Sequence, residues 1–133
     1  MQYLHSDITD LILKAFYNVY NTLGYGFLEK VYEKAMLIEL KKLGLSGIPQ
    51  QRIKVYYDNN EIGDYFADIV VNEVVIVELK SAENLCPEHE AQLVNYLRAT
   101  PVEVGLLLNF GKTLQHKRRV FTNDLKKNLP SNF

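Results

Sequence analysis

The sequence predicts an α/β protein in which helices cover a mixed β-sheet. Three observations support this: helical spacing of apolar residues in the first third, alternation of apolar residues in the middle, and a strand–helix–strand pattern after it. The 133 residues suit one domain, 1–133, which is long enough to bury a core without disulfide bonds. The net charge is −1, so we expect any polyanion to bind in a local groove.

Two helices are predicted first. The segment 7–23 is amphipathic, and the glycines of "GYG" at 24–26 end it. A second helix is predicted over 27–43, with Gly44 after its end and with four residues turned largely inward: Val31, Ala35, Ile38 and Leu40.

The pattern then changes to that of strands. Alternation and turn residues predict strands over 51–58, 63–71, 74–80, 102–110 and 117–122. Pro87 fits the first turn of a helix over 87–99, and a final helical turn follows the last strand. The order is therefore α-α-β-β-β-α-β-β, in which a meander leads into a strand–helix–strand crossover.

Three ionisable residues are expected to meet on the hairpin formed by the second and third strands. If residues 71 and 75 face each other across the turn at Asn72-Glu73, then Asp68 lies opposite Glu78. Side chains alternate along a strand, so Lys80 shares a face with Glu78. Two close carboxylates repel unless a cation lies between them, and Mg²⁺ or Mn²⁺ prefers such oxygen ligands. This arrangement suggests hydrolysis of a phosphodiester; the alternative is a structural ion pair between Asp68 and Lys80.

Two helical pairs are candidates for the same site. Glu29 and Tyr32 lie three residues apart on one helix face, and Gln92 and Tyr96 lie four apart on the helix after the third strand. Glu29 would be a third carboxylate near the metal. Tyr32, Gln92 and Tyr96 are expected to bind the substrate, and Gln92 and Tyr96 could hold a phosphate or a base. The alternatives are an ordinary first-turn carboxylate for Glu29, a core position for Tyr32 and a half-exposed helix face for the other pair.

These residues, in this order, resemble the PD-(D/E)xK nuclease-like superfamily, although Ala67 stands where that signature begins with proline. The chain also resembles the small prokaryotic GxxExxY proteins. Gly26, Glu29 and Tyr32 match the name motif, and the likeness covers about residues 7–121, including "YFADIVVNEVVIVELKSAENL" and "EHEAQLVNYLRAT".

The resemblance implies a restriction-endonuclease-like three-layer core and a metal-dependent nuclease. It implies Asp68 and Glu78 as metal ligands, with the carbonyl of Leu79 and the carboxylate of Glu29 as further candidates. Lys80 would be the catalytic lysine, and Gln92 and Tyr96 match a Gln-x-x-x-Tyr motif of the exonuclease-like branch. It does not specify a substrate.

Two other functions stay open: a non-catalytic module that binds nucleic acid or a protein, and an interaction protein with a structural ion-pair cluster. A minimal core without a recognition domain favours action as a homodimer or with a protein partner, by analogy. The single cysteine, Cys86, an acidic N-terminal segment and the lack of an apolar stretch of about 18 residues lead us to expect a cytoplasmic protein that does not enter membranes.

Overall fold

The chain forms a five-stranded sheet with helices on both faces, as seen in a computed structural model that describes residues 3–126 and 132. The elements are α1 (Ser6–Leu23), α2 (Glu29–Lys42), β1 (Gly47–Tyr57), β2 (Asn60–Val71), β3 (Val75–Lys80), α3 (Pro87–Arg98), β4 (Val104–Phe110), β5 (Leu114–Val120) and a 3-10 turn, η1 (Asn123–Leu125). The predicted order of helices and strands is confirmed. No helix in the described part of the chain is long and apolar enough to cross a membrane.

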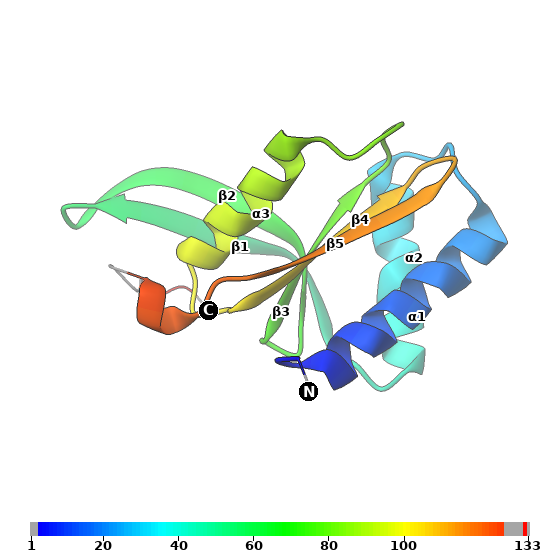
Figure 1. The fold of residues 1–133 in the computed structure, drawn as a ribbon, viewed down its shortest axis with the longest axis horizontal. Helices are drawn as coiled ribbons and strands as arrows, with labels where there is room; N and C mark the ends of the chain where they lie inside the picture. The colour runs from blue at the N-terminus through cyan, green and yellow to red at the C-terminus, as the bar shows by residue number, and fades with distance from the viewer. Residues whose placement is uncertain (1–2, 127–131, 133) are drawn as a thin grey trace.

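The strands lie in the order β1-β2-β3-β4-β5, and the sheet is mixed. β3 and β4 are parallel because α3 connects them as a crossover, and every other neighbouring pair is antiparallel. The sheet separates two apolar cores. One packs α1 and α2 against residues such as Val77 and Leu79, and the other packs α3 against Ile76 and Leu107 (Figure 1). This is the three-layer α/β arrangement expected of a restriction-endonuclease-like core.

Several predicted strand boundaries were wrong for identifiable reasons. β2 begins at Asn60 rather than 63, because the turn before it contains only Asp58 and Asn59, which both have positive φ. Such a two-residue turn fits the twist of a hairpin and leaves more residues for the strands. β1 begins at Gly47 and β5 at Leu114, both earlier than expected.

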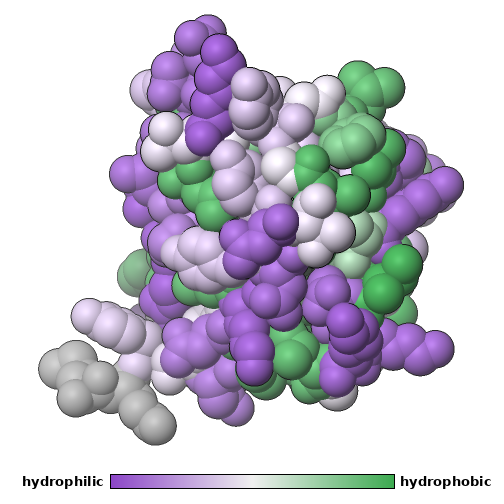
Figure 2. All heavy atoms as spheres, turned by 90° about the vertical axis from the view of Figure 1, so that its right-hand side faces the viewer, coloured by the Kyte–Doolittle hydropathy of each residue, from purple (hydrophilic) through white to green (hydrophobic). Residues whose placement is uncertain are grey.

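The inward face of α2 also differs from the prediction. Tyr32, Met36 and Leu40, spaced by four residues, are completely buried. Val31 and Ile38 were expected inside, but they are 40% and 63% exposed. Figure 2 looks onto the side of the molecule where α1 and α2 lie, and there apolar side chains are interspersed with hydrophilic ones.

Candidate active site

Asp68 and Glu78 lie together where β2 and β3 stop pairing through their backbones. The register runs from Val71 opposite Val75 to Ile69 opposite Val77, as the hairpin argument required. Beyond Ile69 and Val77 the two strands no longer form backbone-to-backbone hydrogen bonds, and the side chains of Asp68 and Glu78 bond to the opposite backbone instead. The Asp68 backbone N–H donates to Glu78 Oε1 at 3.2 Å, and the Leu79 N–H donates to Asp68 Oδ2 at 2.8 Å. Each carboxylate is thus fixed by the opposite strand.

Glu78 is the more buried of the two acids, with only 4% of its surface exposed. Burial, the charge of Asp68 and a hydrogen bond with the Asp68 side chain together raise its pKa to about 9, against the opposing effects of the Asp68 N–H and the charge of Lys80. At neutral pH, without a metal, Glu78 therefore keeps a proton.

Helix α3 covers this pair with a polar contact of its own. Gln92 Nε2 donates to the hydroxyl of Tyr96 at 3.0 Å. Tyr96 packs in the same core as Ala67, the residue before Asp68. Burial and the charges of Glu78 and Asp68 raise the pKa of Tyr96 to about 12. Because the hydroxyl oxygen accepts from Gln92, its own proton remains available for another acceptor. The structure therefore brings Gln92 and Tyr96 to the acidic pair.

Lys80 is half-buried at the end of β3, two residues beyond Glu78. Its charge lowers the pKa of Glu78 against the effect of burial, which indicates that the ammonium group is near the acidic pair. Among the described residues, Lys80 forms no ion pair, whereas five other ion pairs are present. This geometry does not support the structural Asp68–Lys80 pair that the sequence left open.

Glu29 is not part of this carboxylate group. It is exposed at the start of α2, and α2 covers the face of the sheet opposite to α3. In the described part of the chain, no three acidic, histidine or cysteine residues are grouped so that they could hold a metal. The expectation of Glu29 as a third metal ligand beside Asp68 and Glu78 is therefore not met by this structure.

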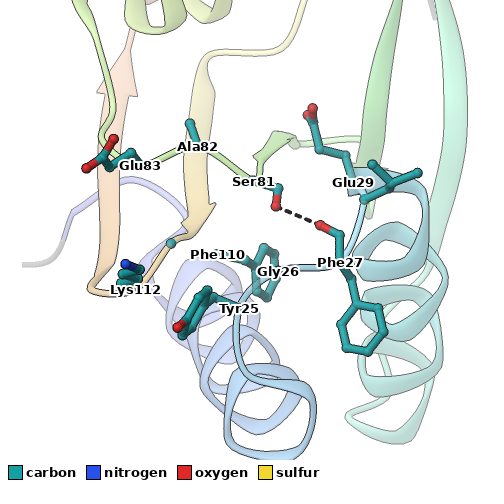
Figure 3. Close-up of a pocket in the computed structure, with 11 residues that line it drawn as sticks. Tyr25, Gly26, Phe27, Glu29, Ser81, Ala82, Glu83, Phe110 and Lys112 are labelled. Atoms are coloured by element: carbon teal, nitrogen blue, oxygen red, sulfur yellow. Dashed lines mark hydrogen bonds between the residues drawn. The ribbon is translucent and has the colours of Figure 1, made fainter.

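Glu29 instead lines a separate cavity of about 460 Å³ at the end of β3 and β4. Figure 3 shows its carboxylate pointing away from Tyr25 and Phe27, which lie on the loop before α2. Ser81 follows Lys80 directly in the chain, and its hydroxyl donates to the Phe27 carbonyl at 2.7 Å, which ties this loop to the end of β3 (Figure 3).

Tyr32 was expected to contact a substrate, and this was wrong for the structure described. Its side chain is 0% exposed and stacks on Phe110, with ring centroids 4.1 Å apart. Its hydroxyl donates to the Gly24 carbonyl at 2.7 Å and accepts from the Phe27 N–H at 3.3 Å. Tyr32 thus holds the loop that contains Gly26, whose φ of 109° favours glycine. The alternative of a core tyrosine is the one observed.

Leu79 contributes only its backbone to this region. Its side chain is buried in the core below α1 and α2, and its N–H is bonded to Asp68. A role for its carbonyl oxygen as a metal ligand stays a prediction.

Asn109 is a buried polar residue that the sequence reasoning missed. It is paired with Lys80 in the parallel ladder of β3 and β4. Its Oδ1 accepts from the Ala82 N–H at 2.9 Å, and its Nδ2 donates to the Ala82 carbonyl at 3.0 Å. An amide at the end of an apolar strand, as in "LLLNF", is the only signal that could have indicated it. Asn109 fixes the chain directly after Lys80.

Replacing Asn109 by alanine should therefore destabilise the protein. The Ala82 N–H and carbonyl would lose their partner, so we expect a loss on the order of 1–3 kcal/mol in the free energy of unfolding. Urea denaturation followed by circular dichroism measures this. The control is Asn95→Ala on the exposed face of α3, which should change stability by less than about 0.5 kcal/mol. Equal effects of the two exchanges would contradict the role given to Asn109.

Comparison with known protein families places residues 6–121 in the PD-(D/E)XK nuclease superfamily. The matched range covers most of the chain, so the protein belongs to this superfamily. Proteins of this class generally use divalent metal ions and act on nucleic acids. No curated protein and no solved structure matches the chain.

Proposed function

We propose that this chain is a nuclease that uses Mg²⁺ or Mn²⁺ to hydrolyse phosphodiester bonds in nucleic acid. The observation that carries the proposal is the pair formed by the half-buried Asp68 and the buried Glu78, held by backbone N–H groups, with Lys80 next to it on β3. Membership of the nuclease superfamily supports the same chemistry.

A hard divalent cation fits the donors present at this site. Glu78 is buried and Asp68 is half-buried beside it, and burial together with the charge of Asp68 raises the pKa of Glu78. A divalent cation that prefers oxygen ligands would neutralise both carboxylates. Asp68 and Glu78 would hold the ion, with the carbonyl of Leu79 as a further candidate, and Glu29 lies outside this set. Bound there, the ion would polarise a phosphoryl oxygen and lower the pKa of a coordinated water.

The neighbouring side chains take complementary roles in this proposal. The Lys80 ammonium group orients the attacking water or stabilises the charge that develops on the phosphate. The Tyr96 hydroxyl, whose proton is free while Gln92 donates to its oxygen, binds a phosphate oxygen or a base of the substrate.

We further propose that the chain is one of the small prokaryotic GxxExxY proteins and acts in the cytoplasm. Gly26, Glu29 and Tyr32 carry that assignment, and the contacts of Tyr32 with the loop around Gly26 give two of these motif residues a structural role. By analogy with other minimal cores, we also propose that the chain acts as a homodimer or with a protein partner.

Metal binding tests the proposal before any substrate is known. In calorimetric titration at pH 8, Mn²⁺ should bind the wild type in a saturable manner. Asp68→Ala should weaken this binding by more than the roughly 10- to 100-fold that loss of a supporting residue produces. High pH favours binding because the proton on Glu78 competes with the ion.

The matched control is Asp58→Ala, which removes an exposed aspartate in the turn between β1 and β2 and should leave the titration unchanged. A wild type that binds no Mn²⁺ would contradict the metal-dependent nuclease. Saturable binding without cleavage of any nucleic acid would favour the alternative, a non-catalytic module that binds nucleic acid or a protein.

A further inference from the structure

We propose that single-stranded nucleic acid is the substrate class and that it reaches the carboxylates along an aromatic surface on the β1–β2 hairpin. This rests on the proposed nuclease function. The relevant segment is residues 51–67, called the arm below. β2 pairs with β3 only from Ile69 onward, so within the sheet the arm has no neighbouring strand (Figure 1). Asp68 lies at its base.

One face of the arm carries aromatic residues directly to the site. Ile53 and Tyr65 are paired across the arm, and Ile53 packs in the core below α3, so this face is turned towards α3. The ring centroid of Tyr65 lies 5.9 Å from that of Tyr96, which packs in the same core as Ala67, the residue directly before Asp68. The register of β1 and β2 shifts between Val55 and Tyr56, and alternation along β1 itself places Tyr57 on the same side as Ile53, at the tip of the arm.

The ring of Tyr65 is held in place but remains accessible. A side chain at Gly63 would approach Tyr65 Cε2 to 2.9 Å, so the ring lies over the bare backbone of that glycine. Tyr65 is nevertheless 48% exposed, and Tyr57 is 69% exposed. A fixed ring with an open face suits stacking of a base, because little side-chain freedom is lost when the base binds.

The charges of the arm favour bases over the backbone of a duplex. Both cations are already engaged on the other face: Arg52 with Asp64 through two hydrogen bonds of 2.8 Å, and Lys54 with Glu61 at 3.4 Å. Few free cations are left there to follow phosphates, which supply most of the affinity for a duplex. Bases within a duplex are stacked on each other, so only an unpaired strand can use the aromatic face.

Binding of labelled oligonucleotides by fluorescence anisotropy in EDTA tests this without cleavage. Single strands of roughly 16 nucleotides, as DNA and as RNA, are compared with the matching duplexes. We expect the wild type to bind a single strand more tightly than either duplex. Tyr65→Ala should raise the Kd for the single strand roughly 5- to 100-fold, the effect of losing one stacking ring.

Phe66 supplies the matched control, because it is 49% exposed but pairs with Arg52 on the opposite face of the arm. Phe66→Ala and Tyr65→Phe should both bind as the wild type does. Tyr57→Ala, at the exposed tip, repeats the test should Tyr65→Ala fail to fold, and should also weaken binding.

The inference is overturned if the duplex binds as tightly as the single strand, or if Tyr65→Ala and Phe66→Ala raise the Kd for the single strand equally. It is also overturned if Tyr65→Ala alters only the oligomeric state in sedimentation, since the arm would then contact a protein. In these cases the proposed nuclease function would still hold if Mn²⁺ binding depends on Asp68 and the protein cleaves a duplex. A wild type that neither binds nor cleaves any nucleic acid would contradict both proposals.

Discussion

The free energy of unfolding of the metal-free protein should fall as the pH rises from about 5 to about 9, and Glu78→Gln should remove most of this fall. The pKa of Glu78 is about 9 in the folded protein and has an ordinary value of 4.5. Between these values the folded state holds a proton that the unfolded state has released. Stability is then lost with rising pH, at up to about 1.4 kcal/mol per pH unit for one proton.

Glutamine reproduces the shape of the protonated acid and can still accept the Asp68 N–H with its side-chain oxygen, but it cannot ionise. The variant should therefore resemble the wild type near pH 5 and exceed its stability by several kcal/mol near pH 9, as an order of magnitude. Urea denaturation at several pH values in EDTA, followed by circular dichroism, gives this difference.

The comparison with wild type cancels the titration of all groups that do not interact with Glu78. Glu83→Gln, an exchange at an exposed residue after Lys80, controls for the loss of one negative charge and should give a curve parallel to the wild type. If the Glu78→Gln curve is also parallel, Glu78 is not a buried acid that holds a proton. Saturating Mn²⁺ should weaken the pH dependence of the wild type, because the ion binds the ionised pair.

The acidic pair could be predicted from the sequence because its register depends on short-range rules. The turn at Asn72-Glu73 sets Val71 opposite Val75, and two-residue alternation then brings Asp68 to Glu78. The position of α3 followed from the crossover between two parallel strands. Such arguments involve only elements that are neighbours in the chain. They correctly predicted the β2–β3 hairpin and the crossover from β3 through α3 to β4.

The contributions of α2 could not be predicted in the same way. Local periodicity shows that a helix has an apolar face, but not which face of the sheet it covers or how far it is rotated. Tyr32 is buried in the core, Ile38 is exposed, and Glu29 lines the cavity at the end of β3 and β4. These differences from the prediction share one cause, which is that the rotation of α2 and the face of the sheet that it covers were unknown.

The sequence could not show that Tyr65 lies on the α3 side of the sheet. The reason is that β2 packs against α3 with one set of alternating residues before Asp68 and with the other set after it. Ala67 and Val70 both lie in the core below α3, although simple alternation would put them on opposite faces. At the same level, Gln50 has a φ of 53° and no partner in the register of β1 and β2. A local bend of this kind depends on the packed structure and leaves no clear pattern in the sequence.

Replacing Lys80 by alanine should remove most of the hydrolysis while leaving the fold and metal binding intact. The lysine forms no ion pair with a described residue and is half-buried, so its removal leaves no buried charge without a partner. Its proposed role is to act on the water or on the charge that develops in the transition state. Loss of such a group typically lowers the rate by roughly 10²- to 10³-fold. Glu78→Ala should instead abolish both metal binding and hydrolysis.

The assay follows end-labelled single- and double-stranded DNA and RNA on denaturing gels with Mg²⁺ or Mn²⁺, alongside thermal melts of each variant. Lys117→Ala, at an exposed lysine of β5, is the matched control and should cleave at the wild-type rate. If Lys80 served a structural ion pair instead, its loss would lower stability by roughly 3–5 kcal/mol when fully buried. Marked destabilisation by both Lys80→Ala and Glu78→Ala, with a wild-type melt insensitive to Mn²⁺, would therefore replace the nuclease with an interaction protein built on the same fold.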